Sequence, residues 1–219
     1  MKINDLDIKC IIFDLDGTLL ASTKVWREVD VNFFKRRGRT LPEGYGKKMA
    51  AMGLEAAAHF TKTTYNIEES EEQIVQEWLN EVQEKYENEV KLKPSAKEYL
   101  EYLKTFNIPL CIATANSKEC YEPCLKHNGI YSYFDHILDV KKYKNGKNSP
   151  DIFFDIAKKN NLEPKDILVF EDTLSVIKVC KNANFNVVGV YDDMCSKEDE
   201  QEKQEISDIY ITDFSSLIK

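Results

Sequence analysis

The chain has 219 residues, of which 42% are hydrophobic and 31% are charged, so it can form a substantial buried core. Its formal net charge of −8 argues against a nucleic-acid-binding surface. It has no apolar run of about 18 residues that could span a membrane, and acidic residues interrupt the stretch MKINDLDIKC, where a signal peptide needs an apolar core. We therefore expect a cytoplasmic protein that binds neither nucleic acid nor a membrane.

The first predicted element is a buried strand at residues 10–13. Its sequence, Cys-Ile-Ile-Phe, lacks the polar alternation of a half-exposed strand and is typical of a parallel sheet. The strand runs directly into Asp14 and Asp16, and ionised carboxylates at such a position need water, hydrogen bonds or a cation. The pair Asp16-Gly17 also marks an ordinary turn, so these residues alone do not identify a site.

The next block, residues 22–90, is predicted to be helical throughout. Apolar residues follow helical spacing in 23–37, and the Ala-rich segment 47–64 is predicted to form a helix with a break near Gly53. The sequence SEEQ at 70–73 is a capping-box pattern that opens a further helix. The block contains no convincing strand, which predicts a separate helical domain.

Strands and helices alternate from residue 91 to the end of the chain. The predicted strands are 108–113, 166–172 and 208–212, and further apolar stretches lie at 136–140 and 185–190. The predicted helices are 95–106, 117–127, 151–160 and 173–182. This alternation indicates βαβ units and a mostly parallel sheet. We therefore predict an α/β core formed by residues 1–21 and 91–219, with the helical domain 22–90 inserted after the first strand.

The six cysteines are scattered along the chain, and only Cys120 and Cys124 lie close together. A disulfide framework would be denser in a small secreted chain, and a zinc site usually shows paired ligands with C-x-x-C spacing. We therefore expect reduced thiols with a structural role.

Polar side chains follow three of the predicted strands, namely Asp14 with Asp16, Thr114, and Glu171 with Asp172. Thr114 and the Glu171-Asp172 pair could also be helix caps. Ligands, however, bind at the carboxyl ends of the strands of an open α/β sheet. Four carboxylates in one crevice repel one another unless a cation lies among them, and Mg²⁺ prefers such oxygen ligands. The sequence therefore predicts a magnesium site at this edge.

Lys147 lies in a polar loop with other lysines and would by itself be a solvated charge. Beside a carboxylate cluster and a hydroxyl group, however, a lysine is suited to binding phosphate oxygens. A carboxylate nucleophile, Mg²⁺, a lysine and a hydroxyl are the groups required for phosphoryl transfer through an aspartyl phosphate.

Four sequence motifs resemble those of the haloacid dehalogenase superfamily, in the same order. They are FDLDGTL at 13–19, ATAN at 113–116, GKNSPDIF at 146–153 and VFEDT at 169–173. The first is highly specific, and the helical block matches the family only in position and helical character. The resemblance implies a Rossmann-like, mostly parallel core with an inserted α-helical cap domain, as in the group of helical-cap phosphatases and β-phosphoglucomutases.

The resemblance also implies roles for the catalytic and phosphate-binding residues. Asp14 would be the nucleophile, and Asp16 would be the general acid and base. Thr114, Ala115 and Lys147 would bind the transferring phosphoryl group.

By the same resemblance, Mg²⁺ would be the cofactor. Its ligands would be the carboxylates of Asp14 and Asp172 and the backbone carbonyl of Asp16, and Glu171 would support the site from nearby.

These inferences predict a phosphatase that hydrolyses a small phosphorylated metabolite through an aspartyl phosphate, with no obligate protein partner. One alternative is a sugar phosphomutase of the β-phosphoglucomutase type, which needs cap residues that bind a second phosphate. The candidates for that role are Arg36, Arg37, Arg39, Lys47 and Lys48. A second alternative is a non-enzymatic phospho-accepting module, but such modules are shorter, lack a helical insertion and have no general acid two residues after the accepting aspartate.

Overall fold

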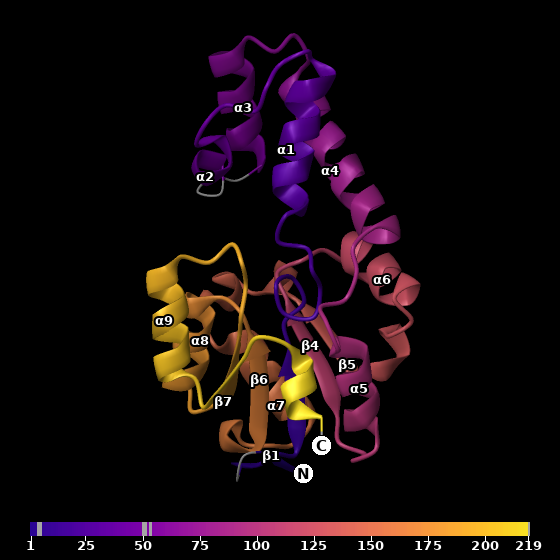
Figure 1. Cartoon of the computed structure of the whole chain (residues 1–219), viewed down its shortest axis with the longest axis vertical. Coiled ribbons are helices and arrows are strands. Elements are labelled where there is room, and N and C mark those ends of the chain that lie inside the picture. Colours follow the sequence, from indigo (N-terminus) through magenta and orange to yellow (C-terminus); the bar gives the residue numbers. More distant parts are fainter. Residues whose placement is uncertain (4–5, 50–51, 53, 219) are drawn as a thin grey trace. The chain divides into compact units, whose positions relative to one another are not determined.

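The computed structural model describes residues 1–3, 6–49, 52 and 54–218. The chain divides into two compact units (Figure 1). The larger unit consists of Met1–Thr23 and Val90–Lys219, and the smaller unit is the contiguous segment Lys24–Glu89. The larger unit is an α/β structure, and the smaller unit contains four helices in its described residues.

Six strands in the described part of the larger unit form one parallel sheet, in the order β5-β4-β3-β6-β7-β8. Their bounds are Cys10–Phe13 (β3), Leu110–Thr114 (β4), His136–Asp139 (β5), Ile167–Glu171 (β6), Asn186–Val190 (β7) and Ile209–Ile211 (β8). A short antiparallel pair, β1 (Lys2–Ile3) and β2 (Leu6–Asp7), precedes the sheet and was not predicted. The predicted Rossmann-like, mostly parallel α/β fold is confirmed.

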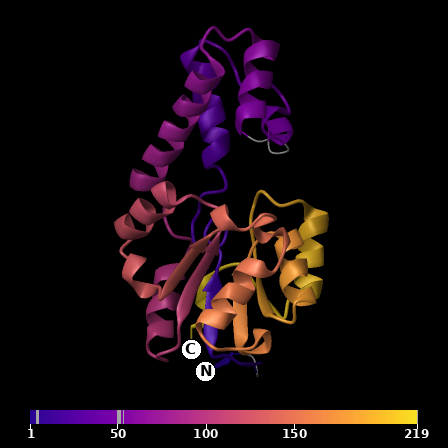
Figure 2. The ribbon, with the colours of Figure 1, turned by 180° about the vertical axis from the view of Figure 1, so that it is seen from behind.

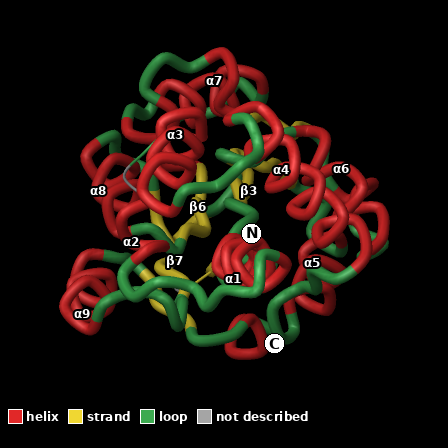
Figure 3. The backbone as a smooth tube through the Cα atoms, turned by 90° about the horizontal axis from the view of Figure 1, so that it is seen from above, coloured by secondary structure: helices red, strands yellow, loops and turns green. Residues whose placement is uncertain are grey.

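Both faces of the central strands are covered by helices, which explains their uninterrupted apolar sequences. Every residue of β3, β4 and β6 is buried. On one face, side chains such as Ile12 and Val169 pack with α7 (Asp151–Lys159) and α8 (Leu174–Asn182). Figure 2, in which the molecule is turned by 180° from Figure 1, shows this face toward the viewer. Viewed from above, α7 and α8 lie on one side of the strands and α5 (Ala96–Lys104) lies on the other (Figure 3).

The face toward α5 is held by an aromatic cluster. The rings of Phe13 and Phe170 stack with their centroids 4.7 Å apart. Tyr99 of α5 packs against Phe170 at 5.7 Å, and Phe214 near the C-terminus packs against both Tyr99 and Phe170. These contacts fix the strand that ends at Asp14 against the strand that ends at Glu171.

Two further helices complete the larger unit in its described residues, α6 (Lys118–His127) and α9 (Lys197–Ile206). Helix α9 packs beside α8 and was not predicted. The cysteines are free thiols, and all except Cys195 are buried, as expected. Across the described ranges, the helices are too short or too polar to cross a membrane.

The smaller unit is built from α1 (Val25–Arg36), α2 (Tyr45–Met49), α3 (Leu54–Tyr65) and α4 (Glu71–Asn88). The predicted capping box opens α4: the Ser70 hydroxyl accepts a hydrogen bond from the Gln73 backbone, and the Gln73 side chain accepts one from the Ser70 backbone. Gly53, the predicted break before α3, lies outside the described residues.

The core of the smaller unit is largely aromatic. Phe33 of α1 packs against Trp78 of α4 with centroids 5.5 Å apart. The neighbouring Phe34 contacts Tyr45 of α2 and Tyr65 of α3 at 5.0 and 5.2 Å. The four helices therefore share one apolar centre within residues 24–89.

Candidate active site

Most of the predicted site residues lie at or just after the ends of three adjacent strands. Asp14 follows β3, Thr114 ends β4, and Glu171 ends β6 with Asp172 next in sequence. Because β4 and β6 flank β3 and all three strands are parallel, their carboxyl ends meet at one edge of the sheet. The Asp14 backbone N–H donates a hydrogen bond to the Phe170 carbonyl at 3.0 Å, which extends the β3–β6 pairing up to the site.

Lys147 lies inside the carboxylate cluster rather than in solvent. Its Nζ donates to Oδ1 of Asp14 at 2.5 Å and to Oε2 of Glu171 at 2.7 Å, and its side chain is 9% exposed. The other oxygen of Glu171 accepts a hydrogen bond from the Thr173 backbone at 3.0 Å. Both oxygens of Glu171 are thus engaged, and this residue holds the lysine against Asp14.

Asp14, Glu171 and Asp172 each offer a carboxylate oxygen, and these oxygens all lie within 4.8 Å of one another. Burial raises the pKa of Asp14 well above its usual value; Lys147 opposes this shift, while Glu171 and Asp172 reinforce it. Burial and the charge of Glu171 raise the pKa of Asp172 to about 7. One ammonium group does not balance three carboxylates, and a hard divalent cation would relieve the remaining repulsion. The donor set therefore fits a hard divalent cation.

The Asp-Gly-Thr sequence after β3 has a packing role as well as a turn role. Gly17 has a φ of +85°, and a Cβ atom at this position would overlap the carboxylate of Asp172. The hydroxyl of Thr18 donates to Oδ1 of Asp172 at 3.2 Å. Glycine is thus required both for its backbone conformation and for the close approach of Asp172. Thr18 is a site residue that the sequence reasoning did not identify.

Asp16 is held by two side chains that were also not identified from the sequence. The Ser22 hydroxyl donates to Oδ1 at 2.6 Å, and the Asn116 amide donates to Oδ2 at 3.0 Å. Ser22 is six residues downstream of Asp16, and Asn116 is two residues after Thr114. Asn116 is the last residue of the motif at 113–116, and Ser22 follows the motif at 13–19; these positions are their sequence signal.

Thr114 is fully buried, and its Oγ1 accepts a hydrogen bond from the Asn116 backbone N–H at 3.0 Å. This accepted bond directs the hydroxyl hydrogen of Thr114 away from Asn116. The next residue, Ala115, is exposed. The β4–α6 turn thus places the buried Thr114 hydroxyl and the exposed residue Ala115 at the same sheet edge as Asp14.

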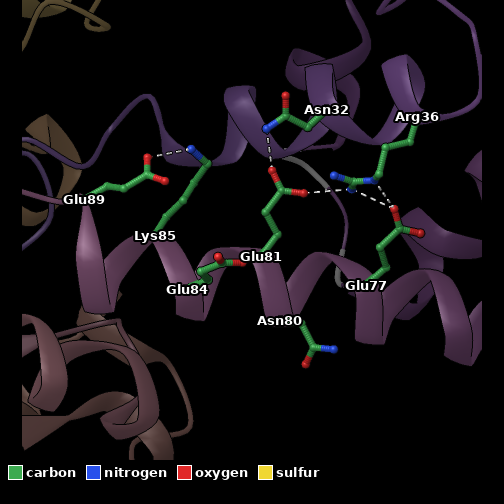
Figure 4. Close-up of a pocket in the computed structure, with 8 residues that line it drawn as sticks. All are labelled: Asn32, Arg36, Glu77, Asn80, Glu81, Glu84, Lys85 and Glu89. Atoms are coloured by element: carbon green, nitrogen blue, oxygen red, sulfur yellow. Dashed lines mark hydrogen bonds and ion pairs between the residues drawn. The ribbon is translucent and has the colours of Figure 1, made fainter.

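The smaller unit has its own groove of about 410 Å³ between α1 and α4 (Figure 4). The two basic side chains that line it, Arg36 and Lys85, both form ion pairs with glutamates of the groove. Arg36 lies 2.7 Å from both Glu77 and Glu81, and Asn32 donates to Glu81 at 2.6 Å. Lys85 pairs with Glu89 at 3.1 Å at the other end. This groove is stabilised by its own ion pairs, and Arg36 is committed to them.

The other basic residues proposed for binding a second phosphate are also engaged within the smaller unit. Arg37 pairs with Glu69 and Glu77, each at 2.6 Å, and stacks over the Phe33 ring. Arg39 donates to the Tyr65 carbonyl. Lys48 lies over the Phe60 ring with its Nζ 4.1 Å from the centroid. The side chain of Lys47 lies outside the described part of the chain.

Comparison with known proteins gives a consistent family assignment. The model of the haloacid dehalogenase-like hydrolase family matches residues 11–190. The chain is 30% identical over 195 residues to (DL)-glycerol-3-phosphatase 1, mitochondrial, of Arabidopsis thaliana, an alignment that covers 85% of this chain but 65% of that longer relative. It is 32% identical over 190 residues to (DL)-glycerol-3-phosphatase 2 of the same plant, covering 83% of this chain and 79% of the relative.

Among solved structures, the β-phosphoglucomutase of Clostridium difficile superposes with a TM-score of 0.69 over 96% of this chain and 93% of the other, at 23% identity. That likeness describes the fold. The family model covers most of the sequence and includes the strands that carry Asp14, Thr114 and Asp172. The chain therefore belongs to the haloacid dehalogenase-like hydrolase family.

Proposed function

We propose that this chain is a Mg²⁺-dependent phosphatase that hydrolyses a small phosphorylated metabolite through an aspartyl phosphate. The observation that carries the proposal is the environment of Asp14. Its buried carboxylate lies at the end of the central strand and accepts a hydrogen bond from Lys147. One of its oxygens lies within 4.8 Å of a carboxylate oxygen of Asp172, close enough for both to bind one metal ion. Two curated relatives named as glycerol-3-phosphatases support a small phosphomonoester as the substrate class.

The carboxylates of Asp14 and Asp172 and the backbone carbonyl of Asp16 would hold Mg²⁺. When bound, the ion would supply positive charge that reduces the repulsion between Asp14 and a phosphate dianion. Glu171 contributes from nearby, because it holds Lys147 by one oxygen and the α8 N-terminal backbone by the other.

The side chains account for both halves of the reaction. In the first half, the Asp14 carboxylate attacks phosphorus, the bond from phosphorus to the leaving alkoxide breaks, and Asp16 gives its proton to that alkoxide. In the second half, Asp16 takes a proton from a water that attacks the phosphoryl group, and the Asp14–phosphorus bond breaks. Lys147, the Thr114 hydroxyl and the Ala115 backbone bind the phosphoryl oxygens throughout.

We also propose that the helical unit Lys24–Glu89 is the cap that selects the substrate. A phosphomutase remains the second candidate, on the strength of the likeness of fold. Arg36 and Arg37 both pair with a glutamate of the same unit. Their guanidinium groups would have to leave these ion pairs to bind a second phosphate, and this favours the phosphatase. Product analysis with a hexose phosphate separates the two: we expect inorganic phosphate, whereas a migrated phosphoryl group would identify a mutase.

Removing divalent metal should abolish phosphate release from p-nitrophenyl phosphate, and added Mg²⁺ should restore it. In Asp172→Asn, half-maximal activity should need at least about tenfold more Mg²⁺, since even outer-shell partners are worth about 10–100-fold in metal affinity. Asp166→Asn, which alters an aspartate paired with Lys9 away from the cluster, should keep the wild-type titration. Activity that survives exhaustive chelation would contradict metal dependence, and an unchanged titration in Asp172→Asn would exclude this residue as a ligand.

A further inference from the structure

The carboxylate of Asp16 is oriented by donors on both of its oxygens. Ser22 donates to Oδ1 and Asn116 to Oδ2, at 2.6 and 3.0 Å. Ser22 is buried and lies near the end of Met1–Thr23, the N-terminal part of the larger unit. Asn116 lies in the turn after β4. Two donors on opposite oxygens fix the plane of the carboxylate, which one donor would leave free to rotate.

Asn116 is itself held in one orientation. Its Oδ1 accepts a hydrogen bond from the Ser117 backbone N–H at 2.8 Å, so its Nδ2 must be the atom that faces Asp16. Its own backbone N–H donates to Thr114 Oγ1. One residue thus connects the hydroxyl proposed for phosphate binding with the carboxylate proposed for proton transfer.

We propose that Asn116 is a positioning residue that aims the Asp16 carboxylate for proton transfer and couples it to the phosphate-binding turn at Thr114. This inference rests on the proposed phosphatase function, and it extends that function to a residue outside the catalytic set. A misplaced proton donor slows only those steps that need a proton. Loss of the Asn116 amide should therefore impair steps that depend on Asp16 and leave attack by Asp14 unaffected.

Two substrates of similar shape distinguish these steps. The nitrophenolate of p-nitrophenyl phosphate leaves with little help from an acid, whereas the phenolate of phenyl phosphate is a poorer leaving group and needs a proton. Asn116→Ala should lower turnover of phenyl phosphate by about tenfold or more, the effect of one hydrogen bond to a charged group. With p-nitrophenyl phosphate, phosphoenzyme should still form but hydrolyse slowly. Intact-protein mass spectrometry after a rapid acid quench should therefore detect one added phosphoryl group.

A second variant separates the hydrogen bond from packing. Asn116→Asp keeps the shape of the side chain but replaces the donor with a carboxylate that repels Asp16, so its defect should be at least as large as that of Asn116→Ala. Asn160→Ala removes a different amide of the same unit, one that donates to the Ile156 carbonyl, and should keep the wild-type ratio of the two substrates. Thermal unfolding of each variant verifies that it is folded.

The outcomes are distinct. If either folded Asn116 variant keeps the wild-type ratio of phenyl to p-nitrophenyl phosphate turnover and accumulates no phosphoenzyme, Asn116 has no positioning role. If both turnover rates fall by the same factor and no phosphoenzyme accumulates, its contribution is structural, and the inference is likewise overturned. If the wild-type chain releases no phosphate from either substrate and acquires no phosphoryl group, the proposed function fails instead.

Discussion

Asp14→Asn should reduce phosphate release to background, a loss of about 10⁴-fold or more, as expected when a covalent nucleophile is removed. The amide has nearly the shape of the carboxylate but is a poor nucleophile toward phosphorus. The fold should persist, because Lys147 keeps its 2.7 Å contact with Glu171. Phosphate release in the presence of Mg²⁺ measures the loss, and mass spectrometry after acid quench should find no phosphoryl group on the variant.

The control for this substitution is Asp155→Asn, which should keep wild-type turnover. Asp155 is a half-buried aspartate that accepts a hydrogen bond from Tyr143. Burial raises the pKa of Asp14, so its ionised form costs the folded state free energy at neutral pH. The unfolding midpoint of Asp14→Asn without Mg²⁺ should therefore not fall appreciably. A phosphoryl group found on Asp14→Asn would place the nucleophile elsewhere and overturn the mechanism.

Lys147→Met should damage both stability and activity. It leaves two buried carboxylates, Asp14 and Glu171, without the ammonium group between them. Breaking a buried ion pair from one side costs about 3–5 kcal/mol, and loss of one group that stabilises the transferring phosphoryl costs about 10²–10³-fold in turnover. Urea unfolding and phosphate release measure the two losses.

The stability loss in Lys147→Met should depend on pH and on metal. It should be largest at neutral pH and shrink under acidic conditions, where protonation removes the unpaired negative charge. Mg²⁺ should restore part of the stability, since it binds the folded cluster. Lys142→Met, which removes an exposed lysine 3.4 Å from Asp155, is the matched control and should unfold like the wild type. Equal stability of the two variants would show that Lys147 does not balance the buried carboxylates.

The sheet and its polar edge were predictable because their signal is local. Apolar runs such as Cys10–Phe13 end in carboxylates, and parallel strands bring those ends together. The roles of Ser22 and Asn116 were not predictable in this way, because a serine or an asparagine beside a turn is ordinary. Only the folded arrangement brings Asn116 to Asp16, 100 residues earlier in the chain.

Helix α9 shows a different limit of sequence reasoning. Its sequence, KEDEQEKQEI, contains one apolar residue, so it lacks the periodicity that indicates an amphipathic helix. The helix buries Lys203 instead, whose Nζ donates to the Val190 carbonyl at 3.2 Å and pairs with Glu200 at 2.9 Å. Ser196, whose hydroxyl caps the Asp199 backbone, is the signal that could have identified it.

The ion pairs of the helical unit were equally hidden. Arg36 and Arg37 are basic residues near the end of a helix, a pattern that fits a solvated surface or a phosphate-binding site. Their glutamate partners lie 32–45 residues away on or near α4, and no local pattern reports contacts at that separation. The sequence around Arg36 and Arg37 therefore did not show that these arginines form ion pairs within the helical unit.

The order of the strands has a consequence for synthesis on the ribosome. The central strand β3 is made before both of its neighbours, β4 and β6, which end at residues 114 and 171. At usual translation rates of about 5–20 residues per second, β3 waits roughly 8–30 s for its second partner. The aromatic centre of the helical unit draws only on residues 24–89 and can assemble during that wait. During that wait the apolar segment Cys10–Phe13 lacks its pairing with β6, so we expect a ribosome-associated chaperone to protect it from aggregation.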